Sequence, residues 1–149
     1  MVCYNDGVQV AIIYESLTGN TERAARLMGD AFWERGVSTR LFPTGSVDTD
    51  VVAAADIVVV GSWTDGLLIV GQRPAKARKL RKHLPDLTGK HCFVYCTYAI
   101  TPRKTLGKLQ KVVEAHGGQV VGGLTIRRDE LEAGAADFVR QVLGAVPAA

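Results

Sequence analysis

Apolar and polar positions alternate with two different periods along the chain, and their order predicts alternating strands and helices. Short apolar runs predict strands at 8–14, 37–42, 57–60, 92–96 and 119–126. Apolar residues at helical spacing predict helices at about 21–35, 51–55, 74–84, 102–115 and 130–143. The fully apolar run from Ile57 to Val60 suits a parallel strand covered on both faces. This alternation of five strands and five helices predicts a three-layer α/β sandwich around a parallel sheet.

Length and composition favour a single domain over residues 1–149. A chain of 149 residues can bury one core and is too short for two ordinary domains. No apolar run reaches the roughly 18 residues of a membrane-spanning helix, and no basic segment leads into an apolar one at the N-terminus. We therefore expect a cytoplasmic protein without a membrane span. Cys3, Cys92 and Cys96 have neither C-x-x-C nor zinc-ligand spacing, so we expect buried thiols and no metal site.

The most informative segment is the phosphate loop, defined here as residues 16–21, between the first strand and the first helix. Because the first N–H groups of a helix have no partner within it, they favour an anion. The loop adds neutral donors and one glycine but no Lys or Arg, which excludes the usual nucleoside-triphosphate loop. Its chemistry suits a phosphomonoester held without a metal. The candidate residues are Ser16, Leu17, Thr18, Gly19, Asn20 and Thr21. The alternative is a plain turn in which Thr18 or Asn20 caps the helix.

The run from Ile12 to Thr21, followed by Ala25, resembles the FMN-phosphate signature of the flavodoxin family. Met28 stands where that family usually has a branched aliphatic residue. The resemblance extends from about residue 8 to residue 146, the expected core of the domain. It implies bound FMN and a sheet of strand order 2-1-3-4-5. Ligands of such sheets bind outside the carboxyl ends of the strands, at the switch between strands one and three.

Two further loops are expected to hold the flavin ring. After the third strand, Trp63 offers a flat surface that we expect to stack on the ring, given the phosphate loop; the alternative is that it packs against Leu67 or Leu68. After the fourth strand, the resemblance implies that Thr97 and the backbone from Tyr98 to Ile100 hydrogen-bond the polar edge of the ring, and that Tyr98 either stacks on the outer face of the ring or borders it. That loop departs from the family, since Thr97-Tyr98 replaces a Gly-Asp pair and the loop is about two residues shorter by alignment with the family. The ring-binding candidates are Ser62, Trp63, Thr64, Asp65, Gly66, Thr97, Tyr98, Ala99 and Ile100.

The formal net charge of +3 conceals a strong asymmetry. Residues 72–111 carry a net charge of +10 and the rest of the chain −7. A surface formed by residues 72–111 would suit an acidic partner, whereas typical flavodoxins are acidic and dock basic partners. The expected docking residues are Arg73, Lys76, Lys79, Arg103 and Lys104. A solvated helix face is the alternative, and nucleic-acid binding is not expected because neither interleaved aromatic residues nor a recognition motif is present.

We expect a flavodoxin-like electron carrier, monomeric or weakly dimeric, that moves electrons between a reductase and an acceptor. The fourth-strand loop has no carboxylate and ends in Arg103-Lys104. Nearby positive charge stabilises a reduced, anionic flavin, so the second reduction potential should be less negative than in an acidic flavodoxin. His83, His91 and His116 lie in no catalytic motif, and we assign no catalytic residue. The alternatives are a small FMN-dependent NAD(P)H or quinone reductase, and a flavin-free interaction module.

Overall fold

The computed structural model describes residues 7–16, 19–64, 77–99 and 104–145. Its strands form one parallel sheet of order β2-β1-β3-β4-β5, which confirms the expected topology. The strands are β1 (Gln9–Tyr14), β2 (Ser38–Pro43), β3 (Ile57–Trp63), β4 (His91–Tyr98) and β5 (Gln119–Arg127).

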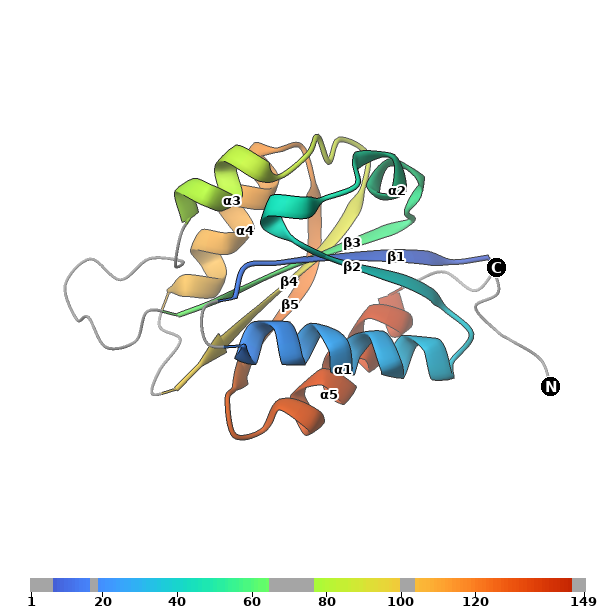
Figure 1. Cartoon of the computed structure of the whole chain (residues 1–149), viewed down its shortest axis with the longest axis vertical. Helices are drawn as coiled ribbons and strands as arrows, with labels where there is room; N and C mark the ends of the chain where they lie inside the picture. Colours follow the sequence, from blue (N-terminus) through green and yellow to red (C-terminus); the bar gives the residue numbers. More distant parts are fainter. Residues whose placement is uncertain (1–6, 17–18, 65–76, 100–103, 146–149) are drawn as a thin grey trace.

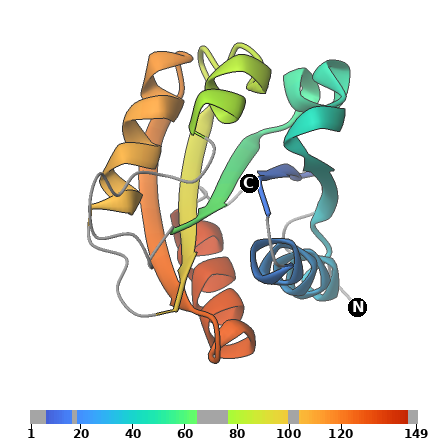
Figure 2. The ribbon, with the colours of Figure 1, turned by 60° about the vertical axis from the view of Figure 1, so that its left-hand side comes forward.

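Helices cover both faces of the sheet (Figure 1). On one face lie α1 (Asn20–Glu34) and α5 (Leu131–Ala145); on the other lie α2 (Thr49–Ala54), α3 (Ala77–His83) and α4 (Thr105–Ala115). The turned view in Figure 2 shows the same three layers, with α3 and α4 as neighbours. A short 3₁₀ helix, η1 (Thr44–Ser46), follows β2 and was not expected from the sequence.

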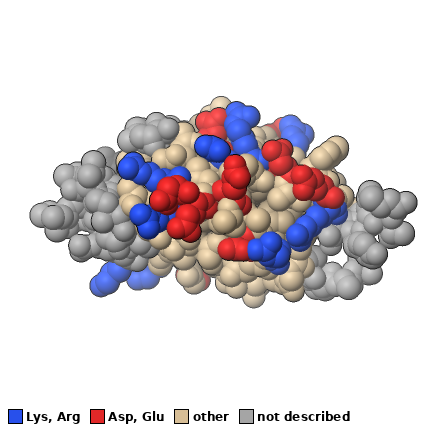
Figure 3. Space-filling view, turned by 90° about the horizontal axis from the view of Figure 1, so that it is seen from below, with Lys and Arg blue, Asp and Glu red and all other residues tan. Residues whose placement is uncertain are grey.

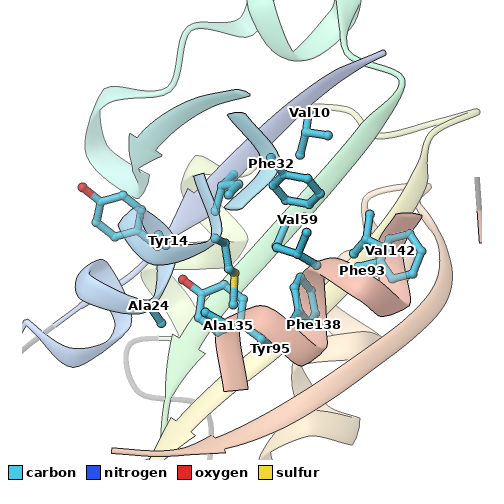
Figure 4. Close-up of a cluster of buried hydrophobic side chains, with 14 of the residues drawn as sticks. Val10, Tyr14, Ala24, Phe32, Val59, Phe93, Tyr95, Ala135, Phe138 and Val142 are labelled. Carbon is cyan, nitrogen blue, oxygen red and sulfur yellow. The ribbon is translucent and has the colours of Figure 1, made fainter. Parts of the chain in front are cut away.

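Each face of the sheet has its own apolar core because successive strand residues point to opposite sides. Along β1, Val10 and Ile12 join the core under α1 and α5, whereas Ala11 and Ile13 join the core under α2, α3 and α4. Figure 4 shows the first of these cores, which is rich in aromatic side chains. Phe138 of α5 contacts Phe93 and Tyr95 edge-on, with ring centroids 6.3 and 5.7 Å away.

Strands β3 and β4 are longer than their apolar runs predict. The sequence placed Gly61–Trp63 and Thr97–Tyr98 in loops, but both segments continue the ladder, with Trp63 paired to Thr97. Backbone hydrogen bonds across the sheet do not require apolar side chains, so polarity misled the prediction there. Pro74 and Pro102, the expected helix starts, lie outside the described residues. The last strand is continuous as expected, apart from a bulge opposite Cys92 and Phe93.

Two smaller expectations concern the cysteines and the membrane. Cys92 and Cys96 are buried free thiols, as predicted, and Cys3 lies outside the described residues. Burial raises the pKa of Cys92 from 9.0 to about 12 and that of Cys96 from 9.0 to about 11.

In the described part of the chain, no helix combines the length and hydropathy needed to cross a membrane.

Candidate functional site

The carboxyl ends of β1, β3 and β4 meet at one edge of the sheet because these strands are parallel neighbours. The chain leaves β1 for α1 on one face, and α3, which follows β3, lies on the other face (Figure 1). Such a divergence creates the crevice in which doubly wound sheets bind ligands. The predicted site residues within the described ranges all lie at this edge: Ser16, Gly19, Asn20, Thr21, Ser62, Trp63, Thr64, Thr97, Tyr98 and Ala99. Leu17, Thr18, Asp65, Gly66 and Ile100 are predicted site residues outside those ranges.

Helix α1 begins in a turn that requires glycine. Gly19 occupies the N-cap position with φ of 94°, in the left-handed region that other residues rarely adopt. The hydroxyl oxygen of Ser16 accepts hydrogen bonds from the N–H of Gly19 at 3.2 Å and from that of Glu22 at 3.3 Å. Asn20 is the first helical residue, so it is not the cap that the plain-turn alternative assumed. The start of α1 is therefore held by Ser16 and Gly19, at the place where a helix favours an anion.

The next turn is anchored to β4 through buried polar groups. The side-chain oxygens of Thr21 and Thr97 lie 2.8 Å apart, and both residues are almost completely buried. The hydroxyl of Tyr95 donates a hydrogen bond to the carbonyl oxygen of Thr21 at 2.8 Å. Burial raises the pKa of the Tyr95 hydroxyl, which therefore stays protonated as a donor. The sequence assigned Thr21 to the phosphate and Thr97 to the ring edge, and it missed that their hydroxyls contact each other.

Within the described part of the chain, two buried polar atoms at the end of β3 have no hydrogen-bond partner, Ser62 Oγ and Trp63 Nε1. Ser62 is fully buried and Trp63 is partly buried. Thr64 is already engaged, since its hydroxyl lies 2.8 Å from Cys96 Sγ and its N–H donates to the carbonyl of Thr97 at 2.8 Å. Buried polar groups are almost always paired in folded proteins, so these two atoms are exceptions, one on each face of β3 because successive strand residues point to opposite sides.

A buried carboxylate was missed by the sequence analysis. Glu15 follows β1 and is only 4% exposed, and the hydroxyl of Thr44 in η1 donates to its carboxylate. The Glu15 N–H also donates to the carbonyl of Gly61 at 3.0 Å. The position of Glu15, directly after an apolar strand, could have indicated that its carboxylate is buried. Its partner Thr44, however, lies in η1, a helix that the sequence did not predict. Glu15 thus ties the end of β1 to β3 and η1.

The basic residues of the segment 72–111 do not all have the same role. Lys104, at the N-cap of α4, is exposed. Lys90 belongs to the basic segment by sequence, yet its ammonium group donates to the carbonyls of Ala53 and, at 2.7 Å, Ala55, so it fastens the end of α2. Arg73, Lys76 and Arg103, together with the side chain of Lys79, lie outside the described part of the protein.

On the opposite face, over α1 and α5, acidic and basic side chains are intermixed (Figure 3). Ion pairs join Arg26 to Glu22 at 2.7 Å and Arg23 to Glu132 at 3.7 Å. This face therefore lacks the one-sided charge that the sequence assigns to residues 72–111.

The fold is that of a doubly wound α/β protein, and its first helix starts at the topological switch point, where such folds bind ligands. The family model described as "Flavodoxin domain" matches residues 11–125, and the chain belongs to the flavodoxin family. No curated protein matches the chain.

Solved flavodoxins share the fold at low identity. Oxidised Flavodoxin 2 from Bacillus cereus superimposes with a TM-score of 0.74 at 22% identity, covering 93% of this chain and 100% of that chain. A flavodoxin from Streptococcus pneumoniae gives a TM-score of 0.70 at 20% identity, with 93% and 100% coverage. Two-electron reduced flavodoxin from Megasphaera elsdenii gives 0.66 at 23% identity, with 86% and 98% coverage. Flavodoxins bind FMN and transfer electrons to redox partners, so this chain is an FMN-binding electron-transfer protein.

Proposed function

We propose that the protein is a diffusible carrier that receives electrons from a reductase and delivers them to an acceptor protein. The observation that carries this proposal is the start of α1 at the switch between β1 and β3, where Gly19 lies in the left-handed region and Ser16 accepts a hydrogen bond from its N–H, a helix start that suits an anion. Neutral donors surround this site, which suits the phosphate of FMN.

The residues at the crevice fit FMN. The phosphate would be held by the phosphate loop, and the ring by the ends of β3 and β4. The buried, unpartnered Ser62 Oγ and Trp63 Nε1 match a ligand that carries its own hydrogen-bonding atoms. FMN supplies reversible one-electron and two-electron chemistry when bound. The protein's own groups bind and orient the cofactor, and Trp63 and Tyr98 are the residues we propose to border the ring.

The partners should present an acidic docking face. Helices α3 and α4 lie side by side (Figures 1 and 2), and they belong to the segment of net charge +10. The exposed Lys104 lies at the start of α4, close in sequence to Tyr98 at the end of β4. We propose that Arg73, Lys76, Lys79, Arg103 and Lys104 steer an acidic partner toward the ring edge. The association rate should then fall steeply as the salt concentration rises.

Stepwise anaerobic reduction of the FMN-loaded protein, followed by absorbance, tests the carrier function. A carrier should accumulate one-electron-reduced flavin during the titration, and the purified protein alone should not oxidise NAD(P)H. Bleaching in a single two-electron step, together with NAD(P)H oxidation, would instead identify a small FMN-dependent reductase. Failure of the protein to bind FMN would refute the proposed site. Ser62→Ala is the matched variant, since it removes one unpartnered oxygen and should weaken flavin binding without unfolding the protein.

A further inference from the structure

Thr97 connects all three segments of the crevice. Its side-chain oxygen lies 2.8 Å from that of Thr21 in α1, and its carbonyl accepts a hydrogen bond from the Thr64 N–H, also at 2.8 Å. Thr97 itself is the penultimate residue of β4 and is 2% exposed. Because its hydroxyl contacts that of Thr21, Thr97 is directed at the phosphate loop.

Phosphate binding would decide which of the two threonine hydroxyls donates the hydrogen bond between them. Each threonine has one proton to donate and two lone pairs that accept, and in the pair either oxygen can be the donor. Phosphate oxygens at neutral pH chiefly accept hydrogen bonds. If Thr21 donates to phosphate, its proton is used, and Thr97 must then be the donor to Thr21 Oγ1. Such a chain strengthens both bonds, because each hydroxyl that accepts a hydrogen bond becomes a better donor.

The backbone of Thr21 is held by the same strand. Tyr95 lies two residues before Thr97, so both side chains project from the same face of β4, toward α1. The Tyr95 hydroxyl donates to the Thr21 carbonyl at 2.8 Å, and its ring is fully buried against Phe138. Two rigidly placed hydroxyls of one strand therefore fix both the main chain and the side chain of Thr21.

We propose that Thr97 and Tyr95 are positioning residues for phosphate recognition. Thr97 donates to Thr21 Oγ1 and so directs the Thr21 proton to the phosphate, while Tyr95 fixes the Thr21 backbone. This inference rests on the proposed function, since it assumes that the anion at α1 is the phosphate of FMN. Neither residue touches the phosphate in this scheme. Their effect should therefore appear in phosphate-dependent binding and not in binding of the flavin ring.

The test compares FMN with riboflavin, which has the same ring and no phosphate, by flavin fluorescence titration of the apoprotein. Thr97→Val keeps the shape of the side chain and removes its hydroxyl. We expect its FMN dissociation constant to rise roughly tenfold, the typical value of one buried hydrogen bond, with less than a twofold change for riboflavin. Thr97→Ser should restore FMN affinity. Tyr95→Phe, which keeps the ring, should show the same selective loss and serves if Thr97→Val does not fold.

Thr39→Val is the matched control, because it removes a threonine hydroxyl from β2 that donates to the nearby Val37 carbonyl, at 3.3 Å. It should leave both dissociation constants unchanged. Equal weakening of FMN and riboflavin by Thr97→Val would overturn the proposal and assign Thr97 to the ring. Unchanged FMN affinity in both the Thr97 and Tyr95 variants would also overturn it. If the wild-type protein binds neither flavin, the proposed function itself fails, and this inference fails with it.

Discussion

Gly61 should tolerate no side chain, because the ring of Tyr95 occupies the space beside it. A Cβ built on Gly61 would lie 2.1 Å from Tyr95 Cζ and 2.2 Å from Cε1. Gly61 is not among the described glycines with positive φ, so alanine could adopt its backbone conformation. The obstacle in Gly61→Ala is therefore the ring alone. That ring cannot move aside easily, since it is fully buried and its hydroxyl is bonded to the Thr21 carbonyl.

The cost of Gly61→Ala follows from two effects. Overpacking a buried site costs about 1–3 kcal/mol. Displacing the ring also breaks the Tyr95–Thr21 hydrogen bond, which contributes about 1 kcal/mol more. We expect the free energy of unfolding to fall by roughly 3 kcal/mol, a large share of the total for a domain of this size. The displaced ring also releases Thr21. The substitution should therefore raise the dissociation constant of FMN by a larger factor than that of riboflavin.

Urea denaturation of a double-mutant cycle measures this clash directly. Tyr95→Leu removes the ring atoms that meet the new Cβ, at its own cost of about 2–4 kcal/mol for a large-to-small core change. The double variant should then be little less stable than Tyr95→Leu alone, which gives a coupling of about 2 kcal/mol or more. Additivity within about 0.5 kcal/mol would refute the reasoning. Gly107→Ala in α4 is the control, because nothing lies within 4 Å of its Cβ position and the change should be neutral or slightly stabilising.

Three further outcomes are expected. Lys90→Met should lower the free energy of unfolding by about 1–2 kcal/mol in urea titrations, because the carbonyls of Ala53 and Ala55 lose their donor, whereas Lys82→Met on exposed α3 should change it by less than about 0.5 kcal/mol. The free energy of unfolding should decline as the pH rises from 9.0 toward about 12, because burial raises the pKa of Cys92 from 9.0 to about 12 and the thiol of the unfolded chain therefore loses its proton first. Cys92→Ala should make this decline less steep. An unchanged slope in that variant would contradict the assignment to Cys92. Lys104→Glu should make the second reduction potential of bound FMN more negative. Reversal of one charge in water at a separation of about 10 Å corresponds to roughly 20–40 mV. Potentiometry that finds no shift in this variant or in Arg103→Glu would show that these cations do not act on the flavin.

The sequence predicted the site best where the chemistry is local. The phosphate loop is a contiguous segment, and Ser16 and Gly19 shape the start of α1 as that segment predicts. Trp63 and Thr97 were predicted as loop residues because polarity hides the end of a strand, and their register is set by the neighbouring strand. The partners of Glu15 were likewise hidden, since Thr44 lies 29 residues away along the chain.

The sequence by itself determined the class of fold and the segment proposed to bind phosphate. Hydrophobic periods fix which residues must be buried, and a strand, a glycine turn and a helix start form from neighbours along the chain. Only the tertiary structure decided which polar side chains serve the site and which support it. Thr21 and Thr97 meet across 76 positions of sequence, and Tyr95 reaches Thr21 across 74. A hydroxyl's role depends on the partner that packing brings to it, and that partner lies on another strand or helix.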